Sequence, residues 1–424
     1  MSEEYNWAGN YKYSSKEWHY PKRIEEIQQL VTRCNKIRVV GTRHSFNGIA
    51  DSKENIISLE KLNKVISLDS DNKTVTVEAG IKYSDLAKYL AKEGYAIRNL
   101  ASLPHISVAG ACATATHGSG NKNSCLSTAV KAMDVVTADG TLVSFSREQN
   151  KGEMEGVVVG LGGLGVVTQL TLDIVPAYEI KQTVYENLLL TEFEHHFDDI
   201  YSSAYSVSSF TNWQDEKINQ VWLKHYVTDS DSDSLEQTLF GASLAKEKQH
   251  PIQGLGTENC TDQLGVPGPW FDRLPHFRMD FVPSSGEELQ SEYIMPRRHG
   301  YKALRAISEI REQIAPLLLV SEVRTIASDN LWMSPCYKED SVGIHFTWKQ
   351  DWGAVQKVLP KVEEQLTPFN AKPHWGKLFT MSPKQVQSGF EKIKDFKQLL
   401  VKYDPKGKFR NEFLDKYIFS EDES

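Results

Sequence analysis

Between Ala101 and Gly120 the chain reads ASLPHISVAGACATATHGSG, and almost every side chain from Ser107 onward is small or hydroxylated. Such a segment lets backbone N–H groups approach a bulky anion, and its Ser and Thr hydroxyls can add hydrogen bonds to phosphate. It is not a P-loop, because no Gly-Lys-Ser/Thr follows, nor a G-x-G-x-x-G turn between strand and helix. The segment therefore fits a pyrophosphate site, and the alternative is a loop packed tightly beneath another element.

A second run of small residues, GLGGLG, occupies residues 160–165 and admits the same two interpretations. Two such runs in one domain favour a large cofactor. The sequence before the first run, RVVGTRHS at residues 38–45, is a short apolar strand that ends at Gly41 and leads into a polar loop containing His44. A histidine in a loop is usually an ordinary exposed or hydrogen-bonded side chain.

Short strands and turn signals alternate through the first 180 residues, which predicts an α+β unit without the long βαβ repeats of doubly wound folds. Asp139-Gly140 is a strong hairpin signal, and a helix is expected between a cap at Ser84 and a stop at Gly94. Strands are expected at residues 37–41, 56–59, 65–68, 74–78, 133–137, 142–145 and 166–175.

The composition shifts toward aromatic residues and longer loops after about residue 180, which indicates a second domain. Within it, the apolar spacing from Tyr301 to Ala315 predicts one helix that Pro316 ends, and a strand is expected at Ser321–Ile326. We expect domains at residues 1–178 and 179–372, with residues from about 373 to 424 returning to the first domain.

Two strands of this second domain carry alternating polar side chains. Glu322 and Arg324 fall on one face of their strand, and His345 and Thr347 fall on one face of another. If the strands are neighbours, four polar groups converge on one patch. The alternative is a solvated outer face of the sheet.

Several motifs of the chain resemble a known family. The sequence GTRHS followed by SLPHISVAG and ATATHGSG resembles the PCMH-type FAD-binding domain of the vanillyl-alcohol oxidase type of flavoenzyme. NCTDQLGVPGPW, LQSEY, EVRT, HFTW and PHWGK are similar to its alditol (xylitol) oxidase branch, and the likeness covers nearly the whole chain. The resemblance implies a two-domain α+β fold in which a cap domain of antiparallel sheet plus helices binds the substrate.

The resemblance implies that FAD is attached covalently, through its 8α position, to His44. A neutral imidazole is a suitable nucleophile for that attachment. Arg43 departs from the glycine that the family usually has there, and Cys112 and Cys125 lie outside the motif of doubly linked flavins. The cofactor contacts expected besides His44 are Val39, Val40, Gly41, Thr42, Arg43, Ser45, Ser102, Ser107, Gly110, Thr114, Ala115, Thr116, His117, Val167 and His374.

The resemblance also implies a polyol site, in which several donors and acceptors pair the hydroxyls of a small uncharged substrate. The expected substrate contacts are Ser102, Gln290, Glu322, Arg324, His345, Thr347 and Lys377. Lys377, Arg324 and Glu322 are expected to polarise the C1 hydroxyl and help remove its proton while hydride passes to the flavin.

Three functions follow as alternatives. The first is an alditol oxidase that turns xylitol or sorbitol into the aldose and O₂ into H₂O₂. The second is an aldonolactone (gulonolactone- or galactonolactone-like) oxidase or dehydrogenase, because those relatives share the linked flavin, the E-x-R pair and an H-W-x-K element. The third is a polyol- or flavin-binding protein without turnover.

Composition argues against other classes of function. The formal net charge is −8 and no run of five Lys/Arg occurs, so nucleic acid is not an expected partner. The first residues lack a leader pattern and no apolar run reaches about 18 residues, so we expect a cytoplasmic protein without membrane contact. A monomer is the default expectation. The five cysteines have no C-x-x-C spacing, and no metal motif occurs, so we expect reduced thiols and no metal.

Overall fold

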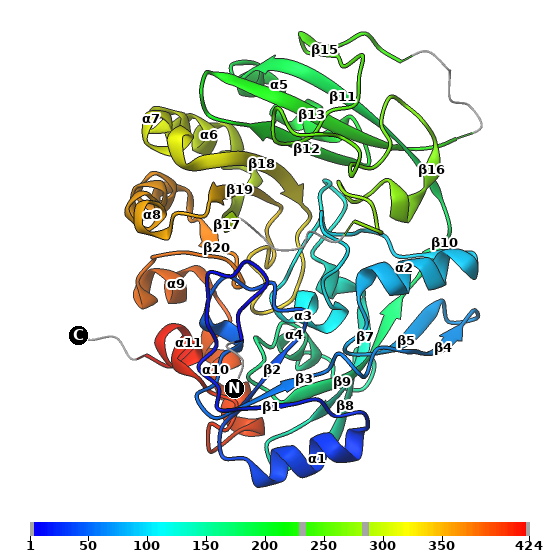
Figure 1. Cartoon of the computed structure of the whole chain (residues 1–424), viewed down its shortest axis with the longest axis vertical. Helices are drawn as coiled ribbons and strands as arrows, with labels where there is room; N and C mark the ends of the chain where they lie inside the picture. Colours follow the sequence, from blue (N-terminus) through cyan, green and yellow to red (C-terminus); the bar gives the residue numbers. More distant parts are fainter. Residues whose placement is uncertain (1–3, 229–234, 282–287, 421–424) are drawn as a thin grey trace.

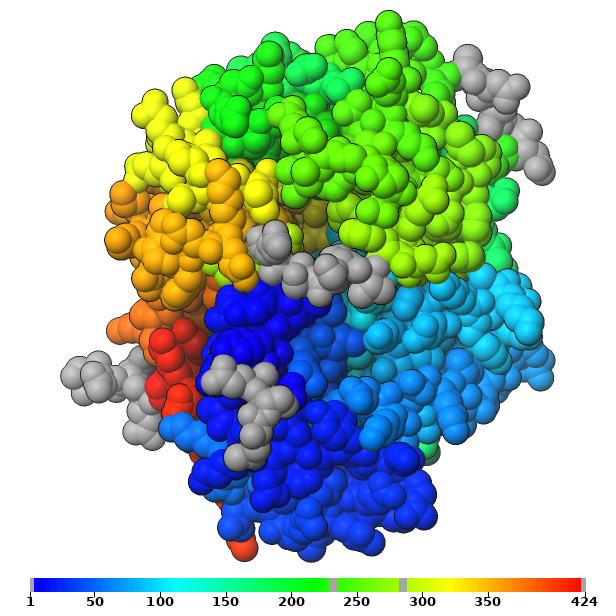
Figure 2. Space-filling model, viewed as in Figure 1, coloured from blue at the N-terminus to red at the C-terminus, as the bar shows by residue number. Residues whose placement is uncertain are grey.

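The computed structural model describes residues 4–228, 235–281 and 288–420 of the 424-residue chain. Four sheets organise these residues, and the first and last parts of the chain lie together below the ten-stranded sheet (Figure 1). The space-filling view shows the blue and cyan segments meeting the green to orange segments across the middle of the molecule (Figure 2). One hydrophobic cluster contains buried side chains from both parts.

The first part of the chain forms three sheets with helices around them. A three-stranded parallel sheet has the order β1 (Glu17–His19), β3 (Asn55–Ser58), β2 (Ile37–Val40). A five-stranded antiparallel sheet has the order β4 (Val65–Asp69), β5 (Thr74–Glu78), β9 (Val166–Asp173), β7 (Val130–Val136), β8 (Leu142–Ser146), and β10 (Val175–Pro176) pairs with β6 (Tyr95–Ala96). The helices are α1 (Ile24–Arg33), α2 (Tyr83–Lys92), α3 (Val108–Ala113) and α4 (Met154–Val157).

The second part is dominated by the ten-stranded antiparallel sheet. Its order is β14 (Thr238–Leu239), β15 (Ala242–Leu244), β11 (Glu179–Leu189), β13 (Lys217–Tyr226), β12 (Ser206–Thr211), β18 (Leu318–Ile326), β19 (Ser341–Lys349), β17 (Glu288–Pro296), β20 (Lys372–Pro373), with β16 (Gly268–Pro269) beside β11. Apolar side chains of one sheet face, such as Val323, Ile344 and Phe346, join the core with those of α5 (Glu192–Ser202), α6 (Gly300–Glu309) and α8 (Trp352–Leu366). The opposite face presents polar side chains on β17, β18 and β19, beside a smaller apolar cluster that includes Phe210, Trp222 and Val320.

The last part of the chain packs against the first. It contains α9 (Pro383–Gly389), α10 (Ile393–Tyr403) and α11 (Glu412–Leu414), which lie beside the blue elements in Figure 1. The guanidinium of the buried Arg38 donates to the carbonyls of Gly162 (2.7 Å) and Phe409 (2.8 Å). Asn411 Nδ2 donates to the carbonyls of Gly48 and Asp51.

Three local expectations differ from the structure. Lys82, not Ser84, occupies the cap position of α2, and Ser84 is buried inside the helix. The helix expected over residues 301–315 is interrupted at Ile310, whose φ of −105° and ψ of 14° separate α6 from α7 (Arg311–Ile314). The strand expected over residues 166–175 divides into β9 and β10, which belong to different sheets.

The remaining strand expectations agree with the structure to within three residues at either end. The hairpin at Asp139-Gly140 joins β7 to β8, and Gly140 has a φ of 87°. All five cysteines are buried and free. Within the described ranges, no helix has both the length and the apolar character needed to cross a bilayer.

Candidate active site

A cavity of about 380 Å³ lies between the ten-stranded sheet and the loops of the first part of the chain. Most of the residues expected at the cofactor and the substrate line it. They are Val40, Gly41, Thr42, Arg43, His44, Ser45, Ser102, Ser107, Gly110, Thr114, Thr116, His117, Gln290, Glu322, Arg324, His345, Thr347, His374 and Lys377.

Three expected cofactor contacts do not line this cavity, namely Val39, Ala115 and Val167. Val39 alternates with Val40 on β2, so the two side chains point to opposite faces. Val167 lines a separate small cavity together with Gly160 and Gly162. The structure therefore gives these three positions no contact with the main cavity.

The second glycine run, residues 160–165, is also absent from the main cavity. A Cβ at Gly162 would lie 3.1 Å from Arg38 Nη2, and one at Gly163 would lie 2.9 Å from Leu400 Cδ2. Its small residues thus allow close packing around Arg38 and α10. Of the two interpretations of this run, the structure supports the packed loop.

The first small-residue segment does face the cavity. A Cβ at Gly41 would lie 2.0 Å from Ser107 Oγ, and one at Gly110 would lie 2.7 Å from the same atom, so neither position has room for a side chain. Ser107 Oγ is buried and has no hydrogen-bond partner among the described residues. A buried hydroxyl without a partner, beside two glycines, fits a phosphate-bearing cofactor such as FAD.

His44 lies at the edge of this segment. Its ring stacks on Trp7 with the centroids 4.9 Å apart, and its Nδ1 shares a 2.9 Å hydrogen bond with Thr42 Oγ1. The backbone N–H of Ser107 also donates to Thr42 Oγ1, at 3.2 Å. Burial lowers the pKa of His44 to about 4, so the imidazole is neutral near pH 7.

Arg43 has a φ of 61°, in the left-handed region that favours glycine. This backbone conformation accounts for the glycine that the family resemblance led us to expect here. The Arg43 side chain has its own contacts: Nη1 lies 2.5 Å from Glu4 Oε2, and the guanidinium lies 4.6 Å from the centroid of the Trp18 ring. These contacts offset the conformational cost of an arginine at this position.

The substrate end of the cavity is built by the register of three neighbouring strands. His345 on β19 pairs with Glu322 on β18 and with Glu292 on β17, and Thr347 pairs with Gln290. The two polar strands are therefore adjacent, as the convergent interpretation of their pattern required. Residues at this register share one sheet face, which points into the cavity.

Glu292 is the buried centre of this polar face, with 1% of its surface exposed. Its Oε2 accepts from Lys377 Nζ at 2.7 Å, its Oε1 accepts from Arg324 Nη2 at 2.6 Å, and His117 Nε2 lies 3.3 Å from Oε1. Burial alone would raise the pKa of Glu292, but Lys377 and Arg324 outweigh burial and hold that pKa well below its ordinary value. Glu292 is therefore a carboxylate that fixes two cations.

Lys377 also contacts the sheet through His345. Its Nζ donates to His345 Nδ1 at 2.8 Å, and His345 Nε2 lies 3.0 Å from Thr347 Oγ1. An ammonium can only donate, so His345 Nδ1 accepts and Nε2–H donates to Thr347. Burial lowers the pKa of Lys377, and Glu292 partly opposes that change.

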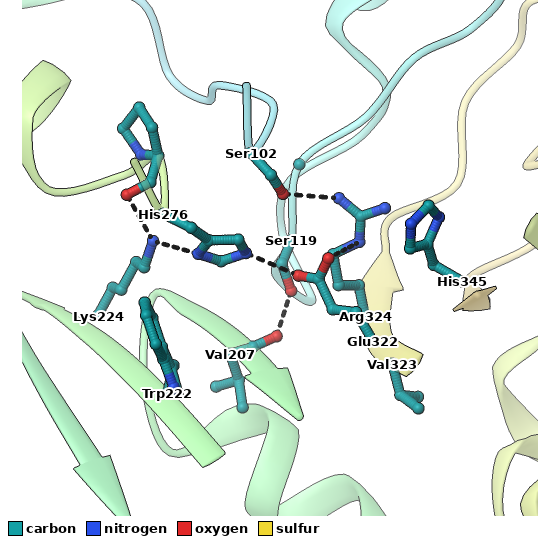
Figure 3. A network of polar contacts seen from close by, with 12 residues as sticks. Ser102, Ser119, Val207, Trp222, Lys224, His276, Glu322, Val323, Arg324 and His345 are labelled. Atoms are coloured by element: carbon teal, nitrogen blue, oxygen red, sulfur yellow. Dashed lines mark hydrogen bonds and ion pairs between the residues drawn. The ribbon is translucent and has the colours of Figure 1, made fainter. Parts of the chain in front are cut away.

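Glu322 and Arg324 form the other side of the polar face (Figure 3). Arg324 Nε lies 3.6 Å from Glu322 Oε2, and Arg324 Nη1 lies 3.4 Å from Ser102 Oγ. Burial would raise the pKa of Glu322, but Arg324 and His276 hold it below its ordinary value. Arg324 Nε is buried and has no partner within hydrogen-bond distance among the described residues, so its only polar contact there is the ion pair with Glu322.

Comparison with known proteins agrees with this geometry. An FAD-binding domain family matches residues 18–146, and a D-arabinono-1,4-lactone oxidase family matches residues 286–417. An alditol oxidase from a Streptomyces species is 44% identical over 96% of this chain and 97% of its own length. The chain belongs to the alditol oxidase family.

More distant relatives have the same fold. The L-gulonolactone oxidase of Mus musculus is 26% identical over 98% of both chains. Cholesterol oxidase from Brevibacterium sterolicum has a TM-score of 0.76 at 14% identity, over 98% of this chain and 96% of its own. A xylooligosaccharide oxidase from Myceliophthora thermophila has a TM-score of 0.76 at 13% identity, over 96% and 92% of the two chains. These likenesses confirm the predicted α+β FAD-binding fold.

This member of the alditol oxidase family is therefore an FAD-dependent oxidoreductase. The polar face of its sheet contains residues that the sequence analysis did not select. Glu288 and Glu292 line the cavity, and they could have been found by extending the alternation at Gln290 along β17. His276 also lines the cavity, but it comes from an irregular loop and no periodic signal marked it.

Among the residues that the structure describes, no cluster of three His, Cys, Asp or Glu side chains could hold a metal ion. Glu292 and Glu322 are paired with Arg324 or Lys377, and Glu288 accepts from Gln290 Nε2. The chemistry that its own side chains offer is thus hydrogen bonding, electrostatic stabilisation and proton transfer.

Proposed function

We propose that this protein oxidises the terminal C1 hydroxyl of alditols such as xylitol and sorbitol to the aldose, with reduction of O₂ to H₂O₂. The observation that carries the proposal is the polar face made by Gln290, Glu322, Arg324, His345 and Thr347, beside Lys377. An alditol is uncharged and has a hydroxyl on every carbon, so it requires many donors and acceptors in a small space.

Arg324 and Lys377 are the groups that bind and polarise the reacting hydroxyl in this proposal. Both are fixed by Glu292, so they are positioned before the substrate binds. Glu322 is an ionised carboxylate beside Arg324 and receives the hydroxyl proton. Bound FAD would supply the acceptor for the C1 hydride, at N5, and the group that O₂ then reoxidises.

His44 holds the FAD covalently at the 8α carbon in this proposal. Its neutral imidazole and its place in the same cavity as the buried Ser107 hydroxyl support the assignment. Stacking on Trp7 and the bond to Thr42 limit rotation of the ring, which favours one orientation for attachment. Ser102, Thr114, Thr116 and His117 also line the cavity and are proposed cofactor contacts.

The second candidate is oxidation of an aldonolactone. The D-arabinono-1,4-lactone oxidase family match over residues 286–417 favours it, because that range contains Glu322, Arg324 and Lys377. The greater identity to the alditol oxidase favours the alditol.

A direct assay separates these candidates. The purified holoenzyme is mixed with xylitol, sorbitol, mannitol, glycerol or L-gulono-1,4-lactone in air, and H₂O₂ is measured with a coupled peroxidase. We expect peroxide and the matching aldose with xylitol or sorbitol. Peroxide with the lactone alone would favour a lactone oxidase, and peroxide with none of the five would contradict both oxidase candidates.

A further inference from the structure

Behind Glu322 a chain of buried polar contacts runs away from the cavity (Figure 3). His276 Nε2 lies 2.8 Å from Glu322 Oε1, and Lys224 Nζ lies 3.3 Å from His276 Nδ1. Lys224 Nζ also donates to the main-chain carbonyls of Leu274 and Pro275, the latter at 3.3 Å. Lys224 does not line the cavity, whereas His276 does.

The proton in each of these contacts can be assigned from the partners. Arg324 and His276 keep Glu322 ionised, and a carboxylate only accepts, so the proton of the 2.8 Å contact belongs to His276 Nε2. Neutral His276 then has a lone pair at Nδ1, which accepts from the Lys224 ammonium. The three N–H groups of that ammonium match three acceptors: two carbonyls and Nδ1.

The surroundings hold this chain rigidly. Lys224 has 1% and His276 has 5% of its surface exposed. The imidazole packs edge-on against Phe210 at 5.3 Å and Trp222 at 5.2 Å between centroids. Both aromatic residues belong to strands of the ten-stranded sheet, β12 and β13, so the orientation of His276 is set by the fold.

We propose that Lys224 is a positioning residue that acts through His276 to hold Glu322 as an oriented, ionised carboxylate at the substrate cavity. The proposal deepens the alditol oxidation proposed above and rests on it. Burying a lysine is costly, and here its charge supports the His276 tautomer that the Glu322 carboxylate requires. Loss of the ammonium leaves two N–H groups for the two carbonyls and Nδ1, which weakens the hold on His276 and, through it, on Glu322.

A pH dependence follows from the charges that face this chain. Lys224 faces Glu322 and Arg324 on β18 as well as His276, and Glu322 in turn faces Arg324 and His345. Burial lowers the pKa of Lys224 to about 7, and Glu322 opposes that change. The ammonium is therefore present below about pH 7 and is lost as pH rises through that value.

The first test reads the tautomer of His276 without turnover. ¹⁵N spectra of histidine-labelled holoenzyme at pH 6 are compared with those of His276→Gln, which identifies the His276 signals. We expect a pyrrole-type Nε2 and a pyridine-type Nδ1. A proton on Nδ1, or on both nitrogens, would overturn the proposal whatever the enzyme oxidises.

The second test is the rate of flavin reduction by xylitol in wild type and Lys224→Met between pH 6 and 9. We expect the variant to be about tenfold slower at pH 6 and close to wild type at pH 9, where wild type has lost the ammonium. Lys372→Met is the matched control, because Lys372 is a largely buried lysine on the same sheet that donates to the Pro335 carbonyl outside the cavity. We expect the ratio of the Lys372→Met rate of flavin reduction to the wild-type rate to be independent of pH.

A pair of variants at His276 checks the same chain if Lys224→Met does not fold. His276→Gln can accept from Lys224 and donate to Glu322, whereas His276→Phe keeps the packing and loses both hydrogen bonds. We expect His276→Gln to retain more of the wild-type rate than His276→Phe.

Two outcomes would overturn the positioning role while leaving alditol oxidation intact. One is equal rates for the two His276 variants, and the other is a ratio of the Lys224→Met rate to the wild-type rate that does not change with pH. Failure of xylitol and sorbitol to reduce the flavin would instead contradict the proposed function.

Discussion

The carboxylate of Glu292 lies 2.7 Å from the ammonium of Lys377, and both groups line the same side of the cavity. Glu292 also accepts from Arg324, so one carboxylate offsets two cations. Removal of that carboxylate leaves Lys377 without its counter-charge and leaves Arg324 with Glu322 alone.

Glu292→Gln is therefore expected to lower the free energy of unfolding by about 3 kcal/mol, because one partner of a buried ion pair is lost. The measurement is denaturant unfolding of both proteins. Glu363→Gln is the control, because Glu363 is a buried glutamate whose partners are Tyr293 and Thr380 rather than a cation. If Glu292→Gln lowers the free energy of unfolding by no more than Glu363→Gln does, the role of Glu292 as a counter-charge is contradicted.

Lys377→Met should slow flavin reduction by xylitol about 100-fold, since a preorganised donor at the reacting oxygen is removed. Stopped-flow absorbance of the flavin measures that step apart from reoxidation. A variant that keeps the full rate of reduction would exclude Lys377 from the proton and hydride steps. The rate at which O₂ reoxidises the flavin of the same variant provides the internal comparison.

Acid precipitation tests the link at His44. We expect the yellow colour of the wild type to stay with the precipitated protein, and that of His44→Ala to pass into the supernatant. His105→Ala is a suitable control, because His105 is a buried histidine that does not line the cavity. Free flavin from the wild type would refute the covalent link and leave the fold assignment untouched.

The pH dependence of flavin attachment has a defined sign. Burial lowers the pKa of His44 to about 4, so its nucleophilic neutral form persists as pH falls, and is lost only near that value. Incubation of apoprotein with FAD, followed by acid precipitation, should give equal rates of attachment between pH 8 and pH 5. A rate that halves at about pH 6.5, the ordinary value for histidine, would show that His44 is not shielded.

Substitutions at Arg43 separate the cost of its left-handed backbone from the stabilisation that its side-chain contacts provide. Arg43→Ala loses the contacts with Glu4 and Trp18 and keeps a left-handed backbone, whereas Arg43→Gly loses the contacts and relieves the strain. We expect the glycine variant to be more stable than the alanine variant by about 1 kcal/mol in denaturant unfolding. Equal stability would mean that the left-handed conformation costs little here.

Periodic patterns made much of this site predictable from sequence. The alternation around Glu322 and His345 predicted which side chains share a face, and strand adjacency then brought them together. Glu292 was missed although it lies on the same alternation as Gln290, because only one residue of that strand was selected. The register that sets Glu292 opposite His345 depends on pairing between strands about fifty residues apart in the chain.

Non-periodic contacts could not be predicted in the same way. His276 lies in a loop, and Lys224 lies on a strand whose face is buried, so nothing local marks either of them as polar partners of Glu322. The GLGGLG run was composed like a cofactor site, yet it packs on Arg38 and α10. Composition alone does not distinguish a loop that approaches a ligand from one that approaches its own core.

The hydrogen bonds of Arg38 and Asn411 have a consequence for synthesis on the ribosome. Arg38 is translated early, but its partner Phe409 and the Asn411 amide that binds the 48–51 loop emerge some 370 residues later. The strand that leads into the His44 loop thus lacks these buried bonds for nearly the whole of translation. We therefore expect stable docking of that region only after translation of Phe409 and Asn411, and we expect C-terminally truncated chains that end before Phe409 to accumulate without cofactor.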